Sequence, residues 1–220
     1  MNIKNKKTYY QIILDKSGSM TDCIDSTING FNEQMQMIKS LQYKFPDQDI
    51  IVSLTTFNQY IDFDIECSRP DKIKEMTTNV NKSKDYTIYS PNGMTALYDA
   101  IGESVNKIQD IAHNEIEKDE ATVVVVIITD GHENASTKFS YKQINSIIKE
   151  LEKSDNWTFS YLSNTPDAID YATSMSIKRE NSFRYNKSDM MNTQGCMANS
   201  LDSYMEKKMR NIKEKQFFKK

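Results

Sequence analysis

The stretch VVVVIITDG, residues 123–131, decides the fold of this 220-residue chain. Its first six residues are all β-branched and apolar, so a strand built from them is apolar on both faces. Such strands are typical of the centre of a parallel sheet that is covered by helices on both sides. The stretch therefore predicts a central parallel strand at 123–129, with the polar turn Asp130-Gly131 at its carboxyl end.

On either side of this strand, the sequence alternates between strand and helix patterns. A strand at 60–65 follows another at 50–57 after only two residues, which permits only an antiparallel hairpin, at a sheet edge. We therefore predict a doubly wound α/β fold with a six-stranded, mostly parallel sheet, one antiparallel edge strand and helices on both faces. The other expected strands are 9–14, 157–162 and 183–185, and the expected helices are near 24–41, 71–76, 95–112, 144–151, 166–175 and 197–205.

The charge and cysteine content exclude several classes of protein. Lys and Arg total 28 against 31 Asp and Glu, and this near-neutral balance argues against a protein that coats nucleic acid. The three cysteines, Cys23, Cys67 and Cys196, are too few for a disulfide scaffold and lack zinc-site spacing. No apolar run approaches the roughly 18 residues of a membrane helix. We expect a cytoplasmic protein with no membrane partner.

The domain organisation follows from the absence of repeats and of linkers rich in Pro, Gly or Ser. We expect one domain over residues 1–220, with its core at about 8–185 and a C-terminal helix and basic tail at about 188–220. The composition of the tail favours its interpretation as the solvated end of a helix. The alternative is that it contacts nucleic acid or an acidic protein. Its basic residues are Lys207, Lys208, Arg210, Lys213, Lys215, Lys219 and Lys220.

Three polar clusters fall where strands end or a helix begins. They are Asp15-Lys-Ser17-Gly-Ser19, Gly93-Met-Thr95 and Asp130-Gly131. Open α/β sheets bind their ligands outside the carboxyl ends of the strands, so the fold can bring these clusters together. Each cluster alone has a simpler explanation as a helix cap, a loop or a turn. Their occurrence together favours one shared site.

The chemistry of these clusters is uniform, since carboxylates and hydroxyls are present without His or Cys. Oxygen ligands suit a hard divalent cation, with Mg²⁺ the default and Mn²⁺ possible. We expect the three hydroxyls to bind the metal directly and the two carboxylates to balance its charge, partly through water. The predicted metal ligands are Asp15, Ser17, Ser19, Thr95 and Asp130.

At these residues the sequence resembles the von Willebrand factor A (vWA) domain family. The 15–19 stretch is similar to its metal-ion-dependent adhesion site (MIDAS) motif, DxSxS, and Thr95 and Asp130 match its separate threonine and second aspartate. The segments 28–32, 129–136, 157–159 and 167–169 are most similar to cytoplasmic bacterial and phage members, whereas 162–166 departs from the small, glycine-containing loop expected there. The resemblance implies a Rossmann-like sheet, Mg²⁺ or Mn²⁺ at its top, and a protein partner that donates Asp or Glu.

Residues next to the motif are candidates for the rim that contacts the partner. Lys16 places a cation beside the predicted metal, and Met20 and Met94 adjoin predicted ligands. His132 and Glu133 follow Gly131 and are read either as partner contacts or, more commonly for such a loop, as solvated residues.

Three functions compete at this stage. The leading hypothesis is a non-enzymatic, metal-dependent protein-binding module. The second is a Mg²⁺-dependent phosphohydrolase or phosphotransferase, because an aspartate after the first strand is also a phosphoryl-accepting position. One such pattern needs a second aspartate where this chain has Ser17, and no Gly-rich phosphate loop is present. The third is an assembly protein with a vestigial metal site.

Overall fold

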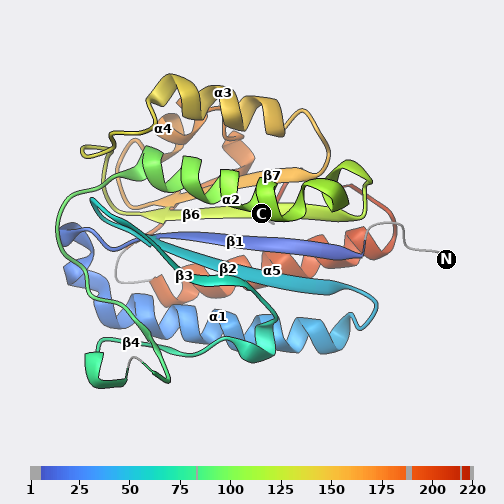
Figure 1. Ribbon diagram of the computed structural model, residues 1–220, viewed down its shortest axis with the longest axis horizontal. Helices are drawn as coiled ribbons and strands as arrows, with labels where there is room; N and C mark the ends of the chain where they lie inside the picture. Colours follow the sequence, from blue (N-terminus) through green and yellow to red (C-terminus); the bar gives the residue numbers. More distant parts are fainter. Residues whose placement is uncertain (1–5, 83, 187–189, 214, 219–220) are drawn as a thin grey trace.

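A six-stranded sheet runs through the computed structural model, which describes residues 6–82, 84–186, 190–213 and 215–218 (Figure 1). The strand order is β3-β2-β1-β6-β7-β8, and every neighbouring pair is parallel except β2 and β3. The predicted central strand and antiparallel edge hairpin are therefore confirmed. The strands are β1 (Lys7–Asp15), β2 (Asp49–Phe57), β3 (Ile61–Ser68), β6 (Ala121–Thr129), β7 (Trp157–Ser163) and β8 (Ser182–Arg184).

Helices cover both faces of the sheet, as the apolar β6 requires (Figure 1). One face carries α2 (Leu97–Glu117), α3 (Tyr141–Leu151) and α4 (Ala168–Ser174), and the other carries α1 (Ile24–Lys44) and α5 (Met190–Met209). Alternation along β1 divides its side chains between two cores. Tyr10, Ile12 and Leu14 join the α1–α5 core, and Tyr9 and Ile13 join the other.

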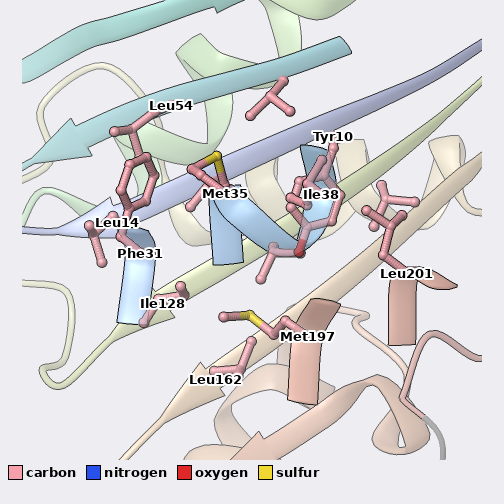
Figure 2. Packing of buried hydrophobic residues seen from close by; sticks show 14 of the residues in the cluster. Tyr10, Leu14, Phe31, Met35, Ile38, Leu54, Ile128, Leu162, Met197 and Leu201 are labelled. Atoms are coloured by element: carbon pink, nitrogen blue, oxygen red, sulfur yellow. The ribbon is translucent and has the colours of Figure 1, made fainter. Parts of the chain in front are cut away.

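The α1–α5 core shows how the helical periodicity is used. Phe31, Met35 and Ile38 of α1 point toward Tyr10 and Leu14 of β1 (Figure 2). Met197 and Leu201 of α5 complete the same cluster from the neighbouring helix (Figure 2). These residues of both helices therefore belong to the core against this face of the sheet.

The segment between β3 and α2 contains only short elements. The prediction of a helix at 71–76 is therefore wrong. Only one 3-10 turn, η2 (Pro70–Lys72), forms there, and Ile73 is already extended. The Asn32 side chain accepts from the Met76 N–H (2.7 Å) and donates to the Met76 carbonyl (3.1 Å), which replaces helical partners. Two short parallel strands follow, β4 (Met76–Thr77) and β5 (Thr87–Ile88), and a 3-10 turn, η3 (Val80–Lys82), lies between them.

The C-terminal segment packs on the sheet, so the prediction of a solvated helix end is wrong. Lys208 on α5 is 7% exposed, and its Nζ donates to Lys7 O (2.5 Å), Thr8 Oγ1 (2.7 Å) and Thr122 Oγ1 (3.0 Å). Phe217 is buried with its ring centroid 6.2 Å from that of Tyr10. The tail packs because the amino ends of β1 and β6 offer oxygens that accept from Lys208, and because Tyr10 of β1 offers apolar surface to Phe217.

Ion pairs hold other lysines of the tail to the same end of the sheet. Lys213 pairs with Asp119 (2.8 Å) and Lys215 pairs with Asp155 (2.7 Å). The basic residues Lys219 and Lys220 lie outside the described residues. Within the described part of the chain, no helix is both long and apolar enough to cross a bilayer.

Candidate metal centre

Three loops meet at the carboxyl edge of the sheet. β1 ends at Asp15 and β6 ends at Thr129, and their parallel pairing places the residues that follow side by side. The Gly18 N–H donates to the Gly93 carbonyl (3.0 Å), which joins the 93–95 loop to the 15–19 loop. The fold thus assembles the three clusters from distant parts of the sequence.

Asp15 lies deepest in the site and is fully buried. Its Oδ1 accepts from the Ser17 N–H (2.6 Å), and its Oδ2 accepts from the Thr129 hydroxyl (2.6 Å). Burial raises the pKa of Asp15 to about 6. The hydrogen bonds from Thr129 and Ser17 lower this pKa and so oppose part of the effect of burial. The negative charge of Asp130 nearby raises this pKa further. A nearby cation would offset both carboxylate charges.

The hydroxyls converge on one space between the loops. Ser17 Oγ and Ser19 Oγ are 3.1 Å apart, and Ser19 Oγ donates to Asp130 Oδ1 (2.5 Å). A Cβ added at Gly131 would lie 3.4 Å from Thr95 Oγ1 and 3.6 Å from Ser19 Oγ. The Thr95 and Ser19 hydroxyls therefore both lie next to Gly131.

The donor set fits a hard divalent cation. Among the described residues there is no group of three or more His, Cys, Asp or Glu side chains that could hold a metal ion. The three loops therefore do not form a carboxylate-rich or thiolate metal site. Two carboxylates with three neutral hydroxyls are oxygen donors of the kind that Mg²⁺ and Mn²⁺ prefer. Asp15, Ser17, Ser19, Thr95 and Asp130 would hold the ion.

Thr95 is positioned by contacts that sequence reasoning did not identify. Its N–H donates to Asn134 Oδ1 (2.8 Å), and the Asn134 N–H donates back to the Thr95 carbonyl (3.0 Å). Gln59 Oε1 accepts from the neighbouring Met94 N–H (3.0 Å). Gln59 lies in the predicted hairpin connection and Asn134 in the 129–136 segment, but neither pattern indicates that these side chains contact the 93–95 loop.

Glu133, a candidate for the rim, is bound by its own chain. Its carboxylate accepts from the N–H groups of Tyr98 (2.9 Å), Ala135 (2.8 Å) and Ser136 (2.6 Å) and from the Ser136 hydroxyl (2.6 Å). These bonds fix the 131–136 loop to the amino-terminal end of α2, where a carboxylate is favoured. Glu133 thus supports the position of Thr95.

Asp99 provides a second clamp that the sequence analysis missed. The side chain is buried and accepts from the N–H groups of Thr137, Lys138 and Phe139, at 2.8, 3.0 and 2.8 Å respectively. The only signal in the sequence is an acidic residue in the first turn of a helix. Together, Asp99 and Glu133 hold residues 133–139 against α2.

The remaining rim candidates differ in exposure. Met20 was expected on the rim, which is wrong, because the 3-10 turn η1 (Gly18–Cys23) directs it into the α1–α5 core with no exposed surface. Met94 is 55% exposed. Lys16 forms an ion pair with Asp62. The half-exposed His132 lies with Nε2 3.4 Å from Asp167 Oδ1 and its ring edge-on to Tyr171.

Comparison with protein families places this geometry in context. Residues 11–199 match the von Willebrand factor type A domain. No curated protein sequence matched the chain.

Solved structures share the fold at low sequence identity. Proximal thread matrix protein 1 from the mussel byssus matches 88% of this chain, with a TM-score of 0.56 and 15% identity. The pilus adhesin SpaC from Lactobacillus rhamnosus GG matches 92%, with a TM-score of 0.61 and 10% identity. A von Willebrand factor type A structure from Catenulispora acidiphila matches 89%, with a TM-score of 0.54 and 14% identity. The matched regions cover 46%, 30% and 42% of those chains respectively, less than half of each.

Proposed function

Because the chain belongs to the von Willebrand factor type A domain family, we propose that it is a protein-interaction module with a divalent cation at its carboxyl-edge site. The cation, Mg²⁺ or Mn²⁺, would be held by the MIDAS-type residues Asp15, Ser17, Ser19, Thr95 and Asp130. When bound, it would offer an open coordination position to an Asp or Glu of a protein partner. The observation that carries the proposal is the convergence of three hydroxyls and two carboxylates from three loops.

The residues of the chain contribute different parts of this function. Neutral hydroxyls from Ser17, Ser19 and Thr95 leave a bound cation with little ligand charge, which favours an external carboxylate. Asp15 is oriented by Thr129 and by the Ser17 N–H, and it supplies negative charge from the interior. Glu133, Asn134 and Gln59 keep the 93–95 loop in place.

The environment of Asp15 favours binding over phosphoryl transfer. A phosphoryl-accepting aspartate must present a free carboxylate oxygen to its substrate. Asp15 has no exposed surface, and both of its carboxylate oxygens accept hydrogen bonds from the chain. We therefore propose that the protein is not an enzyme. The three cysteines are free thiols, which supports our further proposal of a reducing, cytoplasmic location.

Metal binding is tested by calorimetric titration of Mn²⁺ and Mg²⁺. We expect one cation per chain for the wild type and loss of binding for Thr95→Val, which keeps the side-chain shape but removes the hydroxyl. Thr165→Val is the matched control, because Thr165 lies in the loop after β7 and its hydroxyl contacts Ser163. Equal Mn²⁺ affinity in wild type and Thr95→Val would refute the proposed site.

Carboxylate capture is tested by panning a random peptide display library on the chain in Mg²⁺ and eluting with EDTA. We expect the eluted peptides to contain Asp or Glu at one aligned position. Peptides without an acidic residue, or peptides that EDTA does not release, would refute metal-mediated capture. Metal-dependent hydrolysis of p-nitrophenyl phosphate that is abolished by Asp15→Asn would instead support the enzymatic alternative.

A further inference from the structure

Two large apolar side chains stand exposed next to the candidate metal centre. Met94, which directly precedes Thr95, is 55% exposed, and Tyr60, in the β2–β3 turn, is 68% exposed. The two loops are hydrogen-bonded to each other: Met94 N–H donates to Gln59 Oε1 (3.0 Å), and Asn58 Nδ2 donates to the Asn92 carbonyl (3.0 Å). Met94 and Tyr60 therefore adjoin the same interloop contact, and we call them the apolar rim pair.

The backbone beneath the apolar rim pair is held firmly. Gly93 has φ +78°, and a Cβ at this position would lie 1.9 Å from Gln59 Oε1, so only glycine permits the loops to approach this closely. The Ala96 N–H donates to the Asn58 carbonyl (2.8 Å), which adds a backbone bond on the far side of Thr95. A ligand that packs on Met94 and Tyr60 would not have to order these loops first.

A positive charge beside the donor residues is already paired. Lys16, which adjoins Asp15, forms an ion pair with Asp62. A second acidic residue of a partner would therefore compete with Asp62 for the Lys16 ammonium group. Charge complementarity thus favours an apolar neighbour, rather than a further acid, beside the carboxylate that the metal captures.

We propose, on the basis of the proposed function, that the partner segment carries a single Asp or Glu flanked within two positions by an aromatic or large aliphatic residue. That residue packs on the Met94 thioether and the Tyr60 ring, both of which suit apolar and aromatic contact. The metal captures the carboxylate, and the apolar rim pair selects its neighbour. A run of acidic residues is not the ligand.

The EDTA-eluted peptides from library panning test this selectivity directly. We expect apolar residues to be enriched beside the aligned Asp or Glu. The double variant Met94→Ser/Tyr60→Ser should bind the best selected peptide about tenfold more weakly, the loss that one well-packed apolar contact typically causes. Its Mn²⁺ affinity should equal that of the wild type, since neither side chain is in the donor set.

A matched control is Tyr43→Ser/Ile111→Ser, which removes exposed apolar side chains from α1 and α2. This variant should bind the peptide as the wild type does. An independent readout is the methyl NMR signal of Met94, assigned by its absence in Met94→Ser, which should shift when peptide is added.

Two results would overturn the inference and leave the proposed function intact. One is EDTA-released peptides whose acid is flanked by further acids or by no preferred residue. The other is unchanged peptide affinity in Met94→Ser/Tyr60→Ser. Failure of EDTA to release acidic peptides would instead overturn the proposed function and this inference with it.

Discussion

Substitution of Lys208 by Met should remove a specific pH dependence from the stability of the protein. Lys208 lies on α5 with its ammonium group among Lys7 O, Thr8 Oγ1 and Thr122 Oγ1, and it is 7% exposed. Burial lowers its pKa from the ordinary value of 10.5 to about 7, and the charge of Asp119 only partly opposes this effect. Methionine has a similar length and no charge.

The sign follows from proton binding by the folded and unfolded chains. Between about pH 7 and 10.5 the unfolded chain holds a proton on Lys208 that the folded chain lacks, so the free energy of unfolding rises with pH. Below about pH 7 both states are protonated, and the full penalty is about 5 kcal/mol, at about 1.4 kcal/mol per pH unit. From pH 7 to pH 9, Lys208 alone should add about 2 kcal/mol to the stability.

The assay is urea unfolding of the wild type and Lys208→Met at pH 7 and pH 9. Methionine also removes the three hydrogen bonds that the Lys208 ammonium group donates, at a cost that does not depend on pH. For each protein we take the change in the free energy of unfolding from pH 7 to pH 9. The pH-independent cost and the contributions of all other titrating groups cancel when these two changes are subtracted. The wild type should gain about 2 kcal/mol more than the variant on going from pH 7 to pH 9. Identical gains would refute a neutral buried Lys208.

Three other substitutions test the contacts that hold the site and the tail. Gly93→Ala forces a Cβ toward Gln59 at positive φ and should cost about 1–3 kcal/mol in urea unfolding, whereas Gly195→Ala on α5 meets no atom within 4 Å and should not destabilise. Glu133→Gln should speed amide hydrogen exchange at Ala135 and Ser136 and weaken Mn²⁺ binding, because the loop loses charge-assisted hydrogen bonds. Unchanged exchange at these two amides would contradict the role of Glu133 in holding the loop. Phe217→Ala should lower the free energy of unfolding by about 3 kcal/mol. Tyr43→Ala, at an exposed position on α1, should have little effect; equal effects of the two substitutions would contradict packing of the tail on the core.

Much of the fold could be predicted because its determinants are local. The unbroken β-branched run of β6 can satisfy its two apolar faces only between helices, and all nine residues of the strand are buried. The short connection between Phe57 and the next strand allowed only antiparallel pairing of β3 with β2. The DxSxS stretch directly follows the predicted first strand, so its place at the carboxyl edge follows from chain direction.

The features that could not be predicted depend on contacts between distant residues. Met20 is buried because the chain continues in a 3-10 turn, which directs a residue beside the motif into the core rather than to the rim. Glu133 bonds to Tyr98, 35 residues away. Lys208 meets Thr8 across 200 residues, and no local pattern distinguishes a lysine in a solvated tail from one that donates to buried oxygens.

The most direct test of the account is a crystal structure of the chain grown in Mn²⁺, with anomalous diffraction used to locate the metal. We predict one anomalous peak within bonding distance of the hydroxyl oxygens of Ser17, Ser19 and Thr95, next to Asp15 and Asp130. The same crystals of Thr95→Val should lack this peak. A peak at any other position, or none at saturating Mn²⁺, would contradict the proposed metal centre.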